Sequence, residues 1–258
     1  MCFSLFRFTR VQYKKVRSSK IEHICQNGIT NGLLRKLIAR RQSVWILNFG
    51  IQNITKKRMM QQQFYDFISK LLPEHEIELA KVDRYLKTRD LNKGDYLFAA
   101  GEICQFIGFI IKGCFRIFIL KDDKEITFDF FVEDQPICDY ESYFRKQPTQ
   151  FYFQAVETSK LLILNDACLN LLFEESQNGQ RLQRLVVEIL FFRFRDSLLS
   201  LYMDKPEERY LKLLQTKPEL LQRIPQYYLA SYLRLEPESL SRLKRRISSR
   251  SQTKLSAS

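Results

Sequence analysis

Polar and basic side chains recur at helical spacing close to the end of the sequence. The residues that share this face are Glu238, Ser239, Arg242, Arg245 and Arg246. An arginine can bind guanine through two parallel hydrogen bonds, a carboxylate can accept one from cytosine, and a hydroxyl can bind several bases. Further arginines can bind phosphate. This set of side chains has the chemistry needed to read the major groove of double-stranded DNA.

Two short helices must position these side chains. The first is predicted to begin at Pro225, because the missing N–H of proline does no harm at the first position of a helix. Its apolar face comprises Leu229, Ala230 and Leu233. The second has Pro237 in its first turn and Glu238 near the positive end of its dipole. Its inward face comprises Leu240, Leu243 and Ile247. The pattern predicts a helix-turn-helix.

The charge of this segment agrees with nucleic-acid binding. From Leu221 to Ser258, eight Lys and Arg residues stand against two acidic residues, so the local net charge is +6. A basic excess on the reading element is the electrostatic signature of a DNA-binding protein. A solvated pair of amphipathic helices at the end of the chain is the alternative interpretation.

Most of the basic charge of the chain lies elsewhere. The net charge is +13. Residues 1–58 contain thirteen Lys and Arg residues and one acidic residue, whereas residues 59–258 contain 29 Lys and Arg residues and 28 acidic residues. The first 58 residues also lack a sustained periodic pattern. We predict a basic extension that is disordered or lies before the natural translation start. The alternative is an Arg-rich, acid-poor transit peptide.

The composition limits the remaining classes of function. No stretch approaches the roughly 20 apolar residues that cross a bilayer, so a soluble, cytoplasmic protein without membrane contact is predicted. The six cysteines form no C-x-x-C pair, and the histidines are His23 and His75. We predict no metal site, no cofactor, and buried free thiols. Motifs of enzyme active sites are missing from the sequence, so no catalytic residue is predicted.

The hydrophobic period changes along residues 59–258, which predicts an α+β fold. Residues 59 to about 82 have a helical pattern. Short β-type runs then alternate with turns that contain Gly or Asp, as expected for an antiparallel, jelly-roll-like β-roll with flanking helices. The predicted strands are Tyr85–Leu91, Tyr96–Ala99, Phe106–Ile111, Cys114–Leu120, Glu125–Val132, Phe151–Val156 and Lys160–Leu164.

A long helix is predicted from about Asn165 to Met203, with a break near Gln177–Gly179. In its second part, spacings of three and four alternate, as in the seam of a two-stranded coiled coil with one polar member. The seam comprises Leu182, Leu185, Ile189, Phe192, Asp196, Leu199 and Met203. It either packs in the protein's own core or forms a dimer axis. The helix-turn-helix downstream favours the dimer axis, because DNA-reading dimers with paired half-sites are common.

Several short motifs, taken in order, resemble those of the Crp/Fnr family of bacterial transcription regulators over about Met59 to Ile247. They are Lys93-Gly94, Gly101-Glu102, Ile111-Lys112-Gly113, Glu208-Arg209-Tyr210, Ile224-Pro225, Ala230-Ser231-Tyr232-Leu233 and Glu238-Ser239-Leu240-Ser241-Arg242. The resemblance implies a cyclic-nucleotide-binding-like domain at residues 59–176, a dimerisation helix at 177–205 and a winged helix-turn-helix at 206–258. It also implies a homodimer that binds double-stranded DNA and contacts RNA polymerase.

The base-reading positions of that family match well. Its Glu and Arg, one helical turn apart, fall on Glu238 and Arg242, with Ser239 between them. An i, i+4 pair lies on one face of a helix, so both side chains can enter the same groove. Arg234 stands at a turn position where the family usually has Gly. A residue with a β-carbon is strained at positive φ, so Arg234 either alters the turn or serves as a phosphate contact.

The effector positions of the family match poorly. Its cassette uses a Gly-Glu pair, whose Glu holds the ribose hydroxyl, and a later Arg for the cyclic phosphate. Here Asp139 replaces the Glu and Thr149 stands at the Arg position. Without that Arg, burial of a cyclic phosphate would be unfavourable by several kcal/mol. The candidate pocket residues are Asp139, Tyr140, Glu141, Thr149 and Gln150. Five aromatic residues suggest a more apolar cavity, although packing in the protein's core alone would also explain them: Phe131, Tyr140, Phe144, Phe151 and Phe153.

The leading hypothesis is a homodimeric DNA-binding transcription regulator of the Crp/Fnr type that reads a palindromic operator and does not respond to cyclic AMP. The alternative is a sensor of cyclic nucleotides or other small ligands that acts through a protein partner. The sequence does not identify the small-molecule effector, the target genes or the sign of regulation.

Overall fold

The computed structural model describes residues 55, 57–72, 79–176 and 178–255, with side chains at 55, 57–72, 81–176 and 178–249. The chain divides into two units, Met1–Arg58 and Met59–Ser258. The strands and helices named below lie in the second unit, except that the first helix begins at residues 57 and 58 of the first unit. Apart from residues 55, 57 and 58, the expected basic extension lies outside the described residues.

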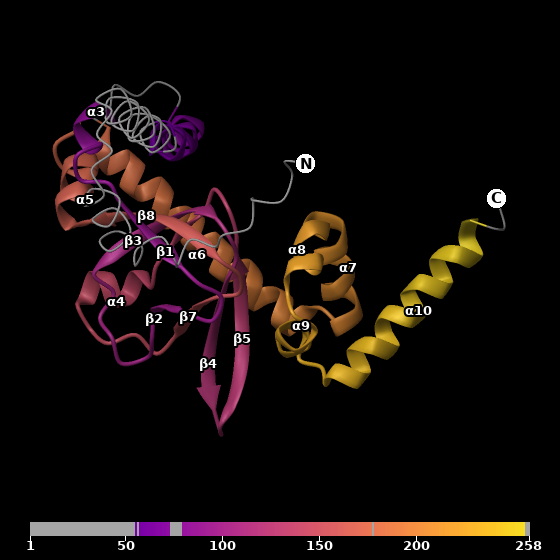
Figure 1. The fold of residues 1–258 in the computed structure, drawn as a ribbon. Coiled ribbons are helices and arrows are strands. Elements are labelled where there is room, and N and C mark those ends of the chain that lie inside the picture. The colour runs from indigo at the N-terminus through magenta and orange to yellow at the C-terminus, as the bar shows by residue number, and fades with distance from the viewer. Residues whose placement is uncertain (1–54, 56, 73–78, 177, 256–258) are drawn as a thin grey trace, which may run out of the picture. The chain divides into compact units, whose positions relative to one another are not determined.

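Two antiparallel four-stranded sheets form the centre of the second unit (Figure 1). One has the strand order β1-β8-β3-β6 and the other the order β2-β7-β4-β5. The described strands are β1 (Lys87–Leu91), β2 (Tyr96–Phe98), β3 (Phe106–Lys112), β4 (Phe115–Lys121), β5 (Lys124–Phe131), β6 (Pro136–Ile137), β7 (Tyr152–Ala155) and β8 (Ser159–Asn165). The predicted β-roll is confirmed, with strand ends within two residues of those expected. The two-residue β6 is additional and is too short to produce a periodic pattern.

The hairpin between β3 and β4 depends on Gly113. Its φ of 115° lies in the left-handed region that favours glycine. A β-carbon there would also lie 2.1 Å from the Ser159 hydroxyl, at the start of β8. The N–H of Gly113 donates to Glu133 Oε1 at 2.7 Å. Any other residue at this position would therefore strain the backbone and displace β8.

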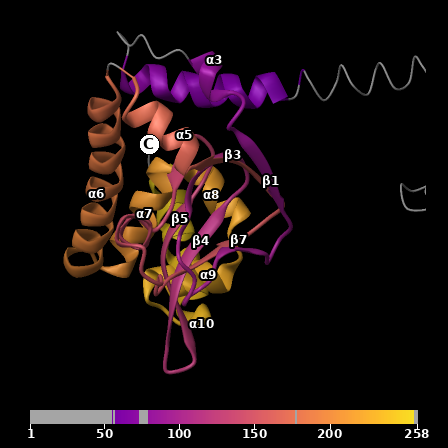
Figure 2. The ribbon, with the colours of Figure 1, turned by 90° about the vertical axis from the view of Figure 1, so that its left-hand side faces the viewer.

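Helices cover one end and one side of the roll. The helix of residues 57–71 crosses the end (Figure 2), and its Phe64 ring meets Phe109 of β3 edge-on at 5.2 Å between centroids. The short α3 (Leu79–Val82) follows, and α5 (Asp166–Phe173) comes directly after β8. The helical pattern expected over residues 59 to about 82 is thus confirmed where those residues are described.

The break expected in the long helix from about Asn165 to Met203 is also confirmed. It separates α5 from α6 (Gly179–Met203), which runs along the side of the roll. Gly179 is required at the break because a β-carbon there would lie 2.2 Å from the Phe173 carbonyl oxygen. The first turns of α6 bury Leu182 and Val186 in the roll's core.

Four helices form the C-terminal part: α7 (Pro206–Thr216), α8 (Pro218–Arg223), α9 (Gln226–Leu233) and α10 (Pro237–Leu255). The last two form the predicted helix-turn-helix, with Leu229, Ala230, Leu233, Leu240 and Leu243 buried. One detail of the prediction is wrong: Pro225 is the cap residue before α9 and not its first helical residue.

The predicted wing is not found among the described residues. After α9 no strand is described, and α10 remains helical to Leu255. Between Glu238 and Leu255 the sequence contains neither Pro nor Gly, the residues that most often end a helix. The chain therefore stays helical from Pro237 to Leu255.

Contacts from α9 hold the C-terminal helices against the roll. The Ser231 hydroxyl accepts a hydrogen bond from the Thr127 N–H at 2.9 Å and donates to the Glu125 carbonyl at 2.8 Å. Phe130 of β5 meets the Tyr232 ring at 5.5 Å. Arg116 of β4, 1% exposed, has its guanidinium 3.5 Å from the centre of the Tyr228 ring. Edge strand β5 and its neighbour β4 thus form the docking surface for α9.

Candidate functional site

The turn between α9 and α10 fixes the direction of the basic helix. Arg234 adopts φ 59° and ψ 42°, the left-handed conformation. The Arg234 N–H donates to the Ser231 carbonyl at 3.1 Å, and the Leu235 N–H donates to the Ala230 carbonyl at 2.9 Å. The strained conformation inferred from the sequence is confirmed, and the Arg234 side chain is exposed beside α10.

The predicted reading face of α10 is exposed to solvent. Its members Glu238, Ser239, Arg242, Arg245 and Arg246 are all exposed, while the opposite face is buried or half-buried. The buried side chains fix the rotation of the helix, so the polar face must point away from the protein. The helix begins with Pro237 and Glu238, which places a carboxylate at the positive end of the dipole.

Two basic residues of α10 are tied to neighbouring helices. Arg246 Nη2 lies 2.6 Å from Glu207 Oε2 of α7. Lys244, which the sequence pattern did not single out, donates to Gln226 Oε1 at 2.6 Å, and burial lowers the pKa of its amine. These contacts brace α10, and they leave Arg242 and Arg245 without an ion-pair partner among the described residues.

The seam on α6 divides into two parts. Leu182 is fully buried, and Leu185 and Ile189 are half-buried, so the first part packs on the roll. Phe192 and Leu199 are 48% and 50% exposed, and Asp196 is exposed. We call the exposed apolar residues of this helix the α6 stripe: Phe191, Phe192, Phe194, Leu198, Leu199, Tyr202 and Met203.

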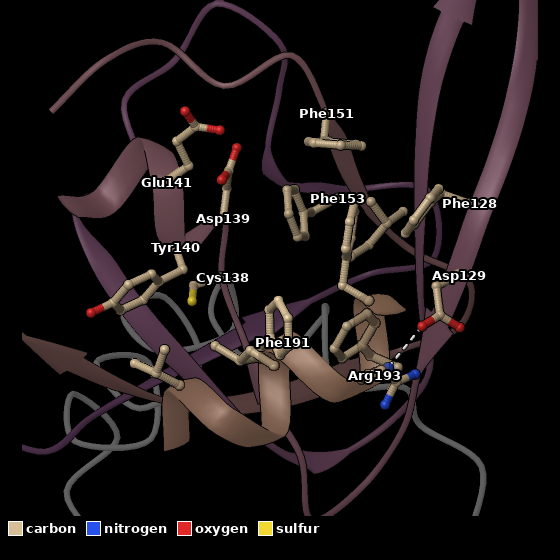
Figure 3. Close-up of a pocket in the computed structure, with 15 residues that line it drawn as sticks. Phe128, Asp129, Cys138, Asp139, Tyr140, Glu141, Phe151, Phe153, Phe191 and Arg193 are labelled. Atoms are coloured by element: carbon tan, nitrogen blue, oxygen red, sulfur yellow. Dashed lines mark hydrogen bonds and ion pairs between the residues drawn. The ribbon is translucent and has the colours of Figure 1, made fainter. Parts of the chain in front are cut away.

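A cavity of about 380 Å³ lies between the roll and α6 (Figure 3). The roll contributes the sheet residues Ile117, Phe128, Asp129, Phe131 and Phe153, together with Phe151, which precedes β7. Residues of the β6–α4 segment are Cys138, Asp139, Tyr140 and Glu141, and those of α6 are Val187, Leu190, Phe191, Arg193 and Phe194. Of the five aromatic residues that suggested an apolar cavity, Phe131, Tyr140, Phe151 and Phe153 line it. Phe144 does not; it is 71% exposed and stacks on Tyr140.

The candidate effector residues fall into two groups. Asp139, Tyr140 and Glu141 line the cavity, whereas Thr149 and Gln150 do not. Asp139 caps α4 (Tyr140–Arg145): its Oδ1 accepts from the Ser142 N–H at 3.2 Å, and its Oδ2 accepts from the Thr149 hydroxyl at 2.5 Å. Asp139 and Thr149 stand at the Glu and Arg positions of the family's nucleotide cassette. Because Thr149 is buried and donates to Asp139, these two positions are hydrogen-bonded to each other.

Arg193 contributes the cavity's cationic group, and it is fully engaged. Its Nε donates to Asp129 Oδ2 at 2.7 Å and its Nη1 to Gln135 Oε1 at 2.7 Å. Its Nη2 donates to the Phe130 carbonyl, and the guanidinium lies 3.7 Å from the centre of the Phe131 ring. Arg193 therefore clamps α6 to β5.

Periodicity could have revealed the α6 side of the cavity. Val187, Leu190, Phe191 and Phe194 follow the spacing i, i+3, i+4 and i+7, which is a second apolar face beside the seam. The sequence carried no signal that Arg193 would bind Asp129, because these residues are 64 positions apart.

The buried thiols agree with the sequence-based expectation. Among the described residues, Cys104, Cys114, Cys138 and Cys168 are free and buried. Burial raises the pKa of Cys114 and of Cys168 to about 12. No group of three or more described metal-ligating side chains comes together, and no described helix is long and apolar enough to span a membrane.

Comparison with known proteins identifies the domain and the fold. Residues 88–176, from β1 to the end of α5, match the family of cyclic nucleotide-binding domains. No curated protein sequence matches the chain.

Solved structures with a similar fold include regulators, among them one of the Crp/Fnr family. FixK2 from Bradyrhizobium japonicum has a TM-score of 0.55 and 14% identity, covering 64% of this chain and 86% of its own. The c-di-GMP responsive global regulator CLP of Xanthomonas campestris has a TM-score of 0.53 and 16% identity, covering 67% and 93%. A Crp/Fnr-family regulator from Eubacterium rectale has a TM-score of 0.53 and 16% identity, covering 67% and 82%. The chain has the Crp/Fnr fold.

Proposed function

We propose that this chain is a DNA-binding transcription regulator of the Crp/Fnr type. The observation that carries the proposal is the exposed face of α10, where Glu238, Ser239 and Arg242 project from a helix whose opposite face is buried. Such a helix can enter the major groove, and its arginines can bind guanine and phosphate. The fold supports the proposal, because two of the solved structures that share it, CLP and the protein from Eubacterium rectale, are described as regulators.

The α6 stripe supports a homodimer. Seven large apolar side chains exposed on one helix are unusual for a monomer. A second copy related by a twofold axis would cover them and would place two α10 helices on paired half-sites. The proposed target is therefore a palindromic operator, with RNA polymerase as the further partner at the promoter.

We propose that cyclic AMP is not the effector. A cyclic phosphate in the cavity would need a cationic partner, but Arg193 is bound to Asp129, Gln135 and Phe130. Arg145 and Lys146, the nearby basic residues in sequence, lie beside Glu141 and Asp166 instead of lining the cavity. Among the described residues that line the cavity, an anion would thus meet carboxylates and no free cation.

The ligand-sensing alternative also has support. The cavity is large enough for a small molecule and is walled by α6, so its occupant could act on a protein partner through that helix. The two functions separate in a DNA-binding experiment, since a sensor that acts only through a protein partner has no operator.

The test is selection of the preferred DNA sequence in vitro, followed by affinity measurements on that site. Arg242→Ala should weaken specific binding by about 1–3 kcal/mol and relax base preference at one position of each half-site. Arg181→Ala, which removes an exposed arginine of α6 outside the helix-turn-helix, should leave binding unchanged. Equal losses from both substitutions, or equal binding to all sequences, would contradict the proposal.

A further inference from the structure

The cavity beneath α6 has the walls of a site for an apolar molecule. Nine of the described residues that line it are aromatic or aliphatic hydrocarbon side chains: Ile117, Phe128, Phe131, Phe151, Phe153, Val187, Leu190, Phe191 and Phe194. Figure 3 shows Phe151, Phe153 and Phe191 around a shared space. The volume of about 380 Å³ lies within the range of small-molecule sites.

The charges at the cavity select against anions. Three carboxylates line it, those of Asp129, Asp139 and Glu141, against one guanidinium among the described lining residues. Arg193 is neutralised by Asp129 at 2.7 Å, and Glu141 is paired with Arg145 at 3.3 Å. Among the described residues, Asp139 is therefore the carboxylate of the lining that has no ion-pair partner. The side chain of Glu141 is 73% exposed, so solvent reaches this part of the lining.

The buried polar groups at the cavity are satisfied within the protein. Asp139 accepts hydrogen bonds from Ser142 and Thr149, and Thr149 also accepts one from the Phe151 N–H at 3.1 Å. A ligand therefore need not supply a polar partner at depth. Its binding would come mainly from apolar contact, and a cationic group could face Glu141 at the mouth.

We propose that this cavity binds a neutral or cationic, mainly aromatic small molecule and disfavours anions of the same shape. The role of this molecule as the regulator's effector rests on the proposed function. Its binding in the cavity does not, because binding does not require DNA. The aromatic rings favour an aromatic occupant, because offset and edge-to-face ring contacts add to apolar burial.

The position of the cavity links its occupant to the α6 stripe. Phe191 and Phe194 line the cavity, and they are 58% and 47% exposed. Phe194 also stacks on Phe128 of β5 at 5.4 Å. A molecule held against these two rings would fix their rotamers at the start of the exposed stripe. The occupant would thereby act on the surface proposed to contact a second copy.

The experiment compares two fluorescent probes that share one aromatic skeleton. N-phenylnaphthylamine is neutral, and anilinonaphthalenesulfonate carries an added sulfonate. In titrations of the full chain, the neutral probe should bind at least about tenfold more tightly, equivalent to about 1.4 kcal/mol. Equal affinity of the two probes would overturn the proposed charge selection, and failure of the neutral probe to bind would overturn the site.

Three variants locate the probe. Val187→Trp, which fills the cavity from α6, should abolish binding of the neutral probe. Tyr202→Ser, on the α6 stripe beyond the cavity, should leave it unchanged; the reverse result would place the probe on the stripe and overturn the proposal. Glu141→Lys changes an exposed side chain, so it tests the charge argument even if Val187→Trp does not fold. It should tighten binding of the sulfonated probe.

The outcome is independent of the proposed DNA-binding function. If the protein binds the neutral probe in the cavity but has no preferred DNA site, the proposed ligand site stands and the proposed regulatory function is contradicted. If the protein binds its operator but neither probe, the proposed regulatory function stands and the proposed ligand site is overturned.

Discussion

Arg234 illustrates a conflict between stability and binding at the scale of one residue. It holds a left-handed conformation that strains any residue with a β-carbon, and it stands exposed beside the proposed reading helix. Arg234→Gly should raise the free energy of unfolding by about 1 kcal/mol and weaken binding to all DNA sequences alike. Urea unfolding and salt-dependent binding measurements test the two effects.

Lys146 provides the matched control for that substitution. It is an exposed basic residue with φ 53° at the end of α4, remote in sequence from the helix-turn-helix. Lys146→Gly should stabilise the fold in the same way and leave DNA binding unchanged. If both substitutions reduced DNA affinity, the effect of Arg234 would not be a local phosphate contact.

Cys138 should be chemically silent although it lines the cavity. Burial raises the pKa of its thiol well above the ordinary value of 9.0, and Cys104 and Asp139 raise it further. The thiolate that reacts with alkylating agents is therefore scarce at neutral pH. Iodoacetamide followed by peptide mass mapping should leave Cys138 unmodified in the folded protein and modify it after unfolding. Rapid modification in the folded state would contradict the burial of the Cys138 thiol in the cavity lining.

At the scale of elements, the α6 stripe yields a prediction on assembly. Leu199→Glu would place a carboxylate opposite its own copy across a twofold axis, so the dimer should dissociate and binding to a palindrome should weaken. Leu120→Glu is the control, since Leu120 on β4 is 51% exposed and Leu199 is 50% exposed. Sedimentation should show monomers for the first variant and dimers for the second; a dimer in both cases would assign the stripe to another partner.

The elements themselves were largely predictable, and their partners were not. Strands of the roll alternate with glycine and aspartate turns, so local pattern was sufficient to place them. The six-residue α4 has too few turns for a periodic signal. On α6, heptad spacing predicted a seam. Because this helix has apolar residues on several sides, its sequence alone does not indicate which side packs against a neighbouring element. The residues that line the cavity are therefore known only from the fold.

The same limit applies to the C-terminal helices. Their apolar faces predicted that α9 and α10 pack together, which is correct. That Ser231, Tyr228 and Tyr232 of α9 contact the roll could not be predicted, because these contacts join residues about a hundred positions apart. The wing was expected only from the family resemblance, and the local sequence of α10 contains no residue that ends the helix before Leu255.

At the scale of the whole molecule, Arg223 ties α8 to the roll. Its guanidinium binds Glu133 at 2.8 Å and 2.9 Å and also contacts Glu157. Burial raises the pKa of Glu133, but hydrogen bonds from Arg223 and from the Gly113 N–H outweigh it and hold the pKa below its ordinary value. The stabilisation by this cluster is therefore complete above the ordinary pKa of Glu and is lost as the pH falls through the lowered value.

Glu133→Gln should accordingly destabilise the protein more at neutral pH than in acid. The difference in unfolding free energy between the wild type and the variant should shrink between about pH 7 and about pH 3. Glu141→Gln, at an exposed ion pair on α4, is the control and should change stability little at either pH. A difference for Glu133→Gln that grows in acid would contradict the assigned direction of the pKa shift.

The contacts of Ser231 have a further consequence for the behaviour of the roll in solution. β5 is the outer strand of its sheet, and the α9 hydroxyl occupies both a backbone donor and a backbone acceptor on its open side. Unprotected outer strands recruit strands from other molecules and so promote aggregation. The helix-turn-helix thus also shields the roll, and a fragment that ends before α7 should aggregate even though its two sheets and α6 are complete.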